Sequence, residues 1–433
     1  MMRKDSKWEG ILMQTYDDKL LKRGRMLYIF YAAVEYLIAL AVSGSFLAKL
    51  TTEIGMSDGL TGVISAVATL GGLFQLISMF IRKSRVKKLA IALTASNQLL
   101  FILLYLIPRL ALGQQVSTGL FALAIVMAYL LMNIAAPKKT SWMMTLVDDR
   151  KRGVFTAYKE MFSLVMGMSF SFGMGALFDW MEGMGKLQAA FGLMAAVMAV
   201  CMLLCVLSMV FMVEKPLPEA AARKPISQTM KELLKNRSLR SVAVLYIIYF
   251  IIINASTPFF GTYQLNELGF SLKLISAFGI LSSVARIVVS PLWGRYADRV
   301  SFAAMLEKAY MALGAAFLFA ALANPSNGKV MFALYYIFNG IASGGINSGM
   351  FNLVFDCAKP EERADALAIC QTISGLTGFL ATLAFSAVVA SLQQGGNQLL
   401  GMTVYAQQAL SAVSLAATLS AIGYLRFRVK KSA

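Results

Sequence analysis

The chain has 433 residues, of which 58% are hydrophobic and only 14% are charged. A soluble protein of this size exposes far more charge, so the composition indicates a polytopic membrane protein without a sizeable soluble domain. Lysine and arginine outnumber the acidic residues by 40 to 22, but they lie between the apolar segments, which argues against a nucleic-acid-binding surface.

Twelve apolar segments are long enough to cross a bilayer, which takes about 20 residues per helix. The expected spans are 27–49, 59–81, 89–107, 119–147, 154–177, 188–212, 240–263, 271–293, 303–323, 330–355, 365–391 and 402–425. The polar leader, 1–26, lacks the apolar core of a signal peptide, so the first span is expected to remain in the protein. The tail is 426–433.

The longest connection, 213–239, divides the spans into six and six. We therefore expect one six-helix bundle over 27–212 and a second over 240–425. Within the connection, Ile226, Met230 and Leu233 follow helical spacing, which favours a helix lying on the membrane surface. A solvated charged linker is the alternative.

The distribution of basic residues predicts the orientation. With the N-terminus cytoplasmic, the cytoplasmic side receives 31 of the 40 lysines and arginines and the other side receives 5. Cytoplasmic loops carry this excess, so both termini are expected in the cytoplasm, with the protein in the plasma (inner) membrane.

The two halves repeat one another at a constant spacing of 214 positions. Glu53-Ile54-Gly55-Met56-Ser57 follows the first span, and Glu267-Leu268-Gly269-Phe270-Ser271 follows the seventh. The same spacing places Gly44 over Pro258, where we expect bends in the first and seventh spans. A shared register across several loops indicates a duplicated bundle.

A short polar string after the eighth span points to a known family. In Pro291-Leu292-Trp293-Gly294-Arg295-Tyr296-Ala297-Asp298-Arg299, a glycine precedes Asp-Arg by four residues. The string resembles the cytoplasmic signature of the major facilitator superfamily, although a simple polar turn is the alternative. The resemblance implies an all-α membrane protein with 12 transmembrane helices in two pseudo-symmetric six-helix bundles, working as a monomer.

The resemblance also implies a conformational gate built from Gly294, Asp298, Arg299 and Arg363. In the family, the glycine lets two helices approach closely and the acid meets a neighbouring helix N-terminus or a basic residue. Asp298 is accordingly expected to face Arg363 at the start of the eleventh span and to stabilise one closed state.

Glu35 is the candidate for proton coupling. It lies about 12 Å into the first span at 1.5 Å per residue, near the bilayer centre, and shares a face with Tyr31. A carboxyl group at this depth can take up and release a proton as its surroundings open to either side. A purely structural ion pair with Lys138, Lys139 or Lys159 is the alternative.

Other polar residues inside the spans are candidates for binding a solute. Lys138 and Lys139 diverge by about 100° around the helix, so only one is expected to face a cavity, where it favours an anionic group. Arg286 is expected near the cytoplasmic surface or at the inner gate, away from the solute. The expected solute-binding residues are Tyr31, Asn133, Lys138, Trp142, Asn254, Asn339, Ser343, Asn347 and Gln371.

The tenth span leaves two interpretations open. Gly340 and Gly344 lie alongside Asn339, Ser343 and Asn347, and small residues in this pattern serve either close helix packing or a cavity wall. For the asparagines we favour the cavity, because unsatisfied amides in lipid are costly.

These features predict a secondary active transporter that moves a small organic solute, favouring an anion, by alternating access coupled to protons. Its partners would be that solute, protons and the lipid bilayer, without nucleic acid, metal or cofactor. Proton-driven efflux of amphipathic drugs or lipids and a solute sensor without net transport are the alternatives. With no histidine and no clustered acids, an enzyme is not expected.

Overall fold

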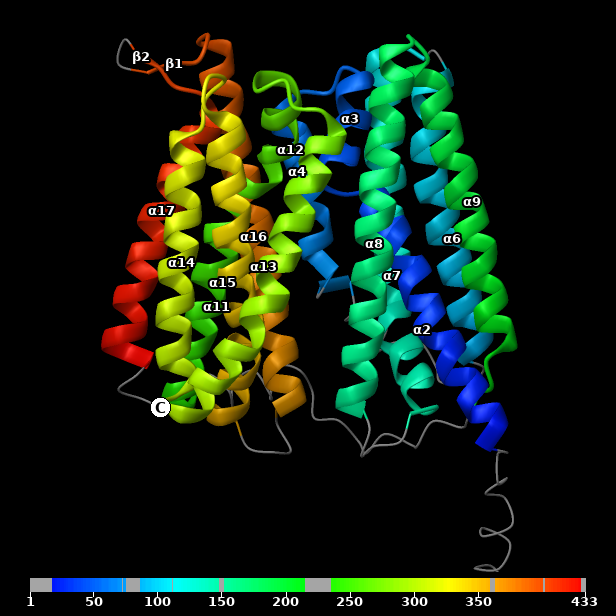
Figure 1. The fold of residues 1–433 in the computed structure, drawn as a ribbon, viewed down its shortest axis with the longest axis vertical. Helices are drawn as coiled ribbons and strands as arrows, with labels where there is room; N and C mark the ends of the chain where they lie inside the picture. Colours follow the sequence, from blue (N-terminus) through cyan, green and yellow to red (C-terminus); the bar gives the residue numbers. More distant parts are fainter. Residues whose placement is uncertain are drawn as a thin grey trace, which may run out of the picture.

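The computed structural model describes residues 18–71, 73–74, 86–110, 112–147, 152–214, 235–358, 363–399 and 402–429. These residues are almost entirely helical, and the long helices run side by side along one direction (Figure 1). Helix α2 begins and helix α17 ends at the same end of the molecule, which we call the terminal end. The opposite end is called the far end.

The first half of the chain forms nine described helical segments. They are α2 (Asp18–Ala41), α3 (Gly44–Glu53), α4 (Asp58–Ala66), η1 (Val67–Leu70), α6 (Val86–Leu106), η3 (Ile107–Leu110), α7 (Gln114–Met144), α8 (Arg152–Gly183) and α9 (Leu187–Phe211).

The second half forms ten described helical segments and a short hairpin. The helices are α11 (Arg237–Ser256), η5 (Thr257–Phe259), α12 (Phe260–Thr262), η6 (Tyr263–Glu267), α13 (Leu272–Arg299), α14 (Phe302–Leu322), α15 (Gly328–Cys357), α16 (Arg363–Gln394), α17 (Ala406–Tyr424) and η7 (Leu425–Val429). Strands β1 (Gln398–Leu399) and β2 (Met402–Thr403) pair antiparallel.

The predicted all-α membrane fold is confirmed. Ten of the described helices are long and apolar enough to cross a membrane. Helix α15, with 30 residues, matches the expected tenth span, and α4 with η1 covers the described part of the second. Helix α2 already begins at Asp18, inside the expected leader. The predicted interfacial helix around Met230 lies outside the described residues, so it stays a prediction.

Each half packs around its own hydrophobic core. The first core joins buried side chains between Tyr28 and Met212, together with Leu272 from the other half. The second joins buried side chains between Leu239 and Leu425. Burial of apolar surface therefore holds each half together largely by itself, and the predicted domain boundaries remain an interpretation of this pattern.

The repeat seen in the sequence has matching local geometry. Gly55 and Gly269 both adopt the left-handed conformation, with φ of 72° and 64°, which costs glycine little. Two residues later in each copy, Ser57 and Ser271 cap the helix that follows by accepting a backbone N–H bond. The expected bends are also present, because α3 starts anew at Gly44 and a 3₁₀ turn begins at Thr257, just before Pro258.

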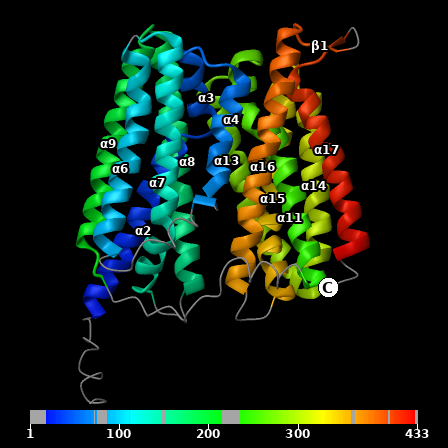
Figure 2. The same ribbon diagram turned by 180° about the vertical axis from the view of Figure 1, so that it is seen from behind.

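The two halves meet mainly towards the far end, as both views show (Figures 1 and 2). There α3 contacts α12, α4 contacts α16, and α8 contacts α13. The pairs α4–α16 and α8–α13 are exchanged by the repeat, as expected for two bundles related by a two-fold rotation.

Candidate functional site

Glu35 sits in a buried cluster with one lysine and one tyrosine. The Tyr31 hydroxyl donates to Glu35 Oε1 at 2.6 Å, and Lys139 Nζ donates to the Tyr31 hydroxyl at 2.8 Å and to the same carboxylate oxygen. Tyr31 is 1% exposed and Lys139 is 6% exposed. The Glu35 side chain keeps 28% of its exposure, so only this acid reaches the surface of the cluster.

Further polar groups lie behind this ion pair. Thr94 and Gln98 of α6 are buried, and neither amide atom of Gln98 has a hydrogen-bond partner among the described residues. Cys205 Sγ of α9 lies 4.0 Å from the Tyr31 carbonyl oxygen.

The structure describes Lys139 and Trp142 of the predicted solute-binding region on α7, and their role in binding stays a prediction. Lys139 reaches Glu35, whereas the side chain of Lys138 lies outside the described residues. Trp142 is fully buried, and its indole N–H donates to the Val213 carbonyl at 3.0 Å. In this conformation the Trp142 side chain therefore packs in the core of the first half.

Asn133 and Asn254 also serve helix packing in this conformation. Each is buried, and each side-chain amide donates at 2.9 Å to the carbonyl four residues earlier in its own helix. Asn133 lies against Gly71, and Asn254 lies against Gly378, with no room for a Cβ atom at either glycine. Each amide thus has one hydrogen bond within its own helix, and its role in lining a cavity stays a prediction.

The glycine row of α15 packs against a neighbouring helix. A Cβ atom at Gly340 would lie 2.2 Å from the Ser282 carbonyl oxygen of α13. A Cβ atom at Gly344 would lie 3.0 Å from Ser290 Oγ and 3.3 Å from the Arg286 carbonyl oxygen of the same helix. Gly345 and Gly349 face α14. The packing interpretation therefore holds for the glycines.

The polar row of α15 lies on the flank next to the α13 contact. Asn339 and Ser343 are half-buried there and Asn347 is exposed. Gln371 of α16 is exposed as well. All four side chains stay available for a solute, and their role stays a prediction.

Three of the four predicted gate residues lie at the exposed end of α13. Gly294, Asp298 and Arg299 are not in a loop: they form the last turns of α13, which continues to Arg299. All three are exposed, and no heavy atom lies within 4 Å of the position of a Cβ at Gly294. Helix α16 begins at Arg363, whose side chain lies outside the described residues, so the expected pair with Asp298 is untested.

Arg286 was expected near the cytoplasmic surface or at the inner gate, and its depth in the membrane stays a prediction. It lies at the middle of the 28-residue helix α13, not near its end. It belongs to a polar row at helical spacing, which the sequence already contains: Gly279, Ser283, Arg286 and Ser290. That periodic row was the signal that would have placed Arg286 on an inward face.

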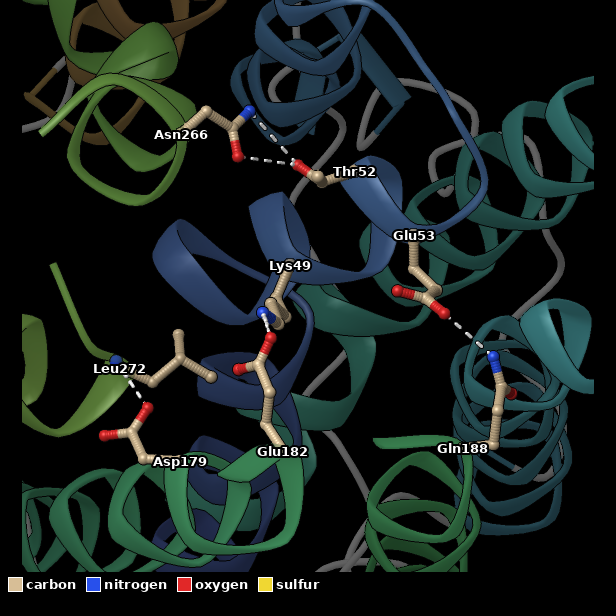
Figure 3. A network of polar contacts seen from close by, with 8 residues as sticks. All are labelled: Lys49, Thr52, Glu53, Asp179, Glu182, Gln188, Asn266 and Leu272. Atoms are coloured by element: carbon tan, nitrogen blue, oxygen red, sulfur yellow. Dashed lines mark hydrogen bonds and ion pairs between the residues drawn. The ribbon is translucent and has the colours of Figure 1, made fainter. Parts of the chain in front are cut away.

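Polar contacts join the halves at the far end, and Figure 3 draws those of Thr52 with Asn266 and of Asp179 with Leu272. Thr52 and Asn266 hydrogen bond at 3.4 Å, and their positions differ by the repeat spacing of 214. Equivalent residues that touch each other lie on the pseudo-two-fold axis. Asp58, beside this axis, accepts from Asn266 at 3.3 Å and from Gln393 at 2.8 Å.

A second far-end contact uses the start of a helix. The carboxylate of Asp179 on α8 accepts the backbone N–H of Leu272 at 2.9 Å (Figure 3). It also accepts the backbone N–H of Lys273 at 2.8 Å. An acid at a helix N-terminus is favourable because the unpaired N–H groups there carry partial positive charge. This contact fastens α13 to α8 across the two halves.

The family follows from comparison with known proteins. The model of the Major Facilitator Superfamily matches residues 26–382, which is most of the chain. The chain belongs to the major facilitator superfamily. It is therefore a multi-pass membrane protein of a transporter family, as the resemblance implied. No curated protein matches the sequence closely enough to identify a subfamily.

Solved structures show the same fold at low sequence identity. The nucleoside transporter NupG has a TM-score of 0.71 and 12% identity, covering 94% of this chain and 99% of its own. An inward-facing bacterial homologue of the lysosomal transporter Spinster has a TM-score of 0.64 and 13% identity, and the match covers 97% of this chain and 96% of the homologue. A bacterial homologue of the iron transporter ferroportin in its inward-facing state has a TM-score of 0.65 and 16% identity, and the match covers 96% of this chain and 99% of the homologue. In its outward-facing state the TM-score is 0.55.

Proposed function

We propose that this chain is a secondary active transporter that moves a small organic anion by alternating access, coupled to protons. The observation that carries the proposal is the buried cluster of Glu35, Lys139 and Tyr31. Ionisable residues inside membrane spans are costly and mark substrate or proton pathways by default. Here an acid keeps partial exposure while its basic partner is buried, which gives a proton access to the acid.

The arrangement of the halves supports alternating access. In the described residues, the hydrogen bonds between halves lie at the far end, and the gate residues at the terminal end are exposed. The basic connections assign the terminal end to the cytoplasm, so this conformation faces inward. The higher similarity to the inward-facing ferroportin homologue supports the same assignment. We propose a monomer in the plasma membrane with both termini cytoplasmic.

The cluster suggests how protons and solute are linked. While Glu35 is ionised, it holds the Lys139 ammonium and neutralises it. Protonation of Glu35 removes that negative charge and leaves Lys139 free to attract an anion. Loss of the proton on the other side of the membrane restores the ion pair and favours release of the solute. Proton and anion then bind the same conformations, which couples their fluxes.

The test is accumulation in proteoliposomes. A panel of carboxylates, phosphate esters and nucleosides is screened first by thermal shift, with nucleosides included because NupG has the same fold. The best ligand is then used for uptake driven by a pH gradient. Glu35→Gln is expected to abolish accumulation while keeping part of the exchange between equal solute pools, because only the proton step is removed.

Glu160→Gln provides the matched control, since Glu160 is an exposed carboxylate on α8. It is expected to leave proton-driven accumulation unchanged. Undiminished accumulation in Glu35→Gln would refute the assigned proton site, and absence of gradient-driven uptake for every ligand that binds the wild type would refute the transport proposal.

A further inference from the structure

We propose that Arg286 and Lys139 together bind the anionic group of the solute, a carboxylate or a phosphate, between the two halves of the protein. This inference rests on the proposed function and specifies its solute-binding site. Arg286 would be the cation contributed by the second half, facing the Glu35–Lys139 cluster of the first.

The geometry of α13 places Arg286 on a face directed between the halves. One side of α13 packs on α15, through Ser282 and Trp293. Another side packs on α8 of the first half, through Leu272. The row of Gly279, Ser283, Arg286 and Ser290 borders the α15 side, because Ser290 Oγ lies 3.0 Å and the Arg286 carbonyl oxygen 3.3 Å from the Cβ position of Gly344. That face looks neither into the core of the second half nor directly at lipid.

The neighbours of Arg286 come from both halves. Its positive charge acts on the hydroxyls of Tyr36 on α2 and Tyr249 on α11. The repeat spacing of 214 makes Tyr249 on α11 the equivalent of Glu35 on α2. The two residues therefore occupy equivalent positions about the pseudo-two-fold axis. Arg286 therefore lies at the depth of the proton-coupling cluster.

Among the described residues, the charges near Arg286 do not balance. Lys139 is matched by Glu35. Arg286 is half-buried, and none of the ion pairs among the described residues includes it. A cation retained at the middle of a span without a protein anion calls for another partner. The planar guanidinium offers paired N–H donors that match the two oxygens of a carboxylate or phosphate.

The surroundings suit the uncharged remainder of such a solute. Gly344 packs against the Arg286 backbone, which sets Asn339 and Ser343 of α15 at about the same level. Both side chains are half-buried, and the hydroxyl of Ser343 keeps its acceptor capacity while donating to the Asn339 carbonyl. These groups provide hydrogen bonds without adding charge.

The experiment measures ligand-induced thermal shifts of the full-length protein in neutral phosphatidylcholine nanodiscs, where no anionic lipid competes. The probes are matched pairs of an anion and its neutral counterpart: gluconate with glucose, and uridine monophosphate with uridine. Wild type is expected to respond to at least one anion more strongly than to its neutral partner. Arg286→Gln is expected to raise the half-saturating anion concentration about tenfold or more, with Arg286→Lys intermediate.

Two variants make the test specific. Arg295→Gln removes an exposed arginine from the end of the same helix and should leave the anion response unchanged. Glu35→Gln frees Lys139 from its partner, so at neutral pH it should strengthen the anion response. The opposite effects of Glu35→Gln and Arg286→Gln separate an anion site from general destabilisation.

The proposal is overturned if no anion stabilises the wild type, if neutral partners respond equally, or if Arg286→Gln binds as wild type does. Gradient-driven uptake of a neutral probe would support the proposed transport function and refute only the proposed anion-binding site. Anion binding that depends on Arg286, without any uptake, would support the anion-binding site and refute the proposed transport function.

Discussion

At the scale of single residues, the central feature is an ion pair with a shared tyrosine. The sequence predicted that Glu35 lies deep in the membrane and that one of three lysines would meet it, but not which one. Lys138 and Lys139 point about 100° apart, and the apolar surface of α7 does not reveal which face turns inward. Trp142, which was also expected in the site, is buried in this conformation and its indole N–H donates to the Val213 carbonyl.

The pairing makes a prediction for stability. Glu35→Gln, Lys139→Met and the double variant form a double-mutant cycle, with thermal unfolding in detergent as the measurement. Removal of one partner leaves the other group buried without a counter-charge. The double variant should therefore be more stable than the sum of the two single losses predicts, by about 1–3 kcal/mol. Additive losses would show that the two side chains do not stabilise each other.

At the scale of helices, the sequence predicted the spans well and their ends poorly. The charged residues after Pro291 were interpreted as a loop, yet α13 continues through them to Arg299. Hydropathy shows which residues tolerate lipid, whereas a helix ends where its backbone hydrogen bonds end. The glycines of α15 were ambiguous in sequence, since only the neighbour across the interface distinguishes close packing from an open wall.

The α13–α15 interface gives the prediction at this scale. Gly340→Ala would place a methyl group 2.2 Å from the Ser282 carbonyl oxygen, so the two helices must separate. Overpacking of this kind costs about 1–3 kcal/mol, and thermal unfolding is expected to show the loss. Gly173→Ala in α8 is the control, because nothing lies within 4 Å of its Cβ position and glycine-to-alanine changes favour a helix. Equal behaviour of both variants would contradict the packing assignment.

At the scale of the whole molecule, the main feature is the repeat that relates the two halves. The spacing of 214 positions appeared in the sequence, and the structure shows equivalent turns at Gly55 and Gly269 and a contact between the equivalent residues Thr52 and Asn266. The sequence could not show that this axis is closed at the far end, because the state of the gate depends on contacts between the halves. Such contacts, including Asp58 with Gln393, join residues far apart in the chain.

The most direct test of alternating access measures two distances between spin labels in proteoliposomes. One pair of labels replaces Lys186 and Lys329 at the far end, and the other replaces Lys88 and Lys308 at the terminal end; all four side chains are exposed. Alternating access coupled to Glu35 predicts that a change from alkaline to acidic buffer shifts the two distance distributions in opposite directions. In Glu35→Gln the two distributions should not change with pH. Distances that stay fixed, or that lengthen together at both ends, would contradict rocking of two halves around a central site.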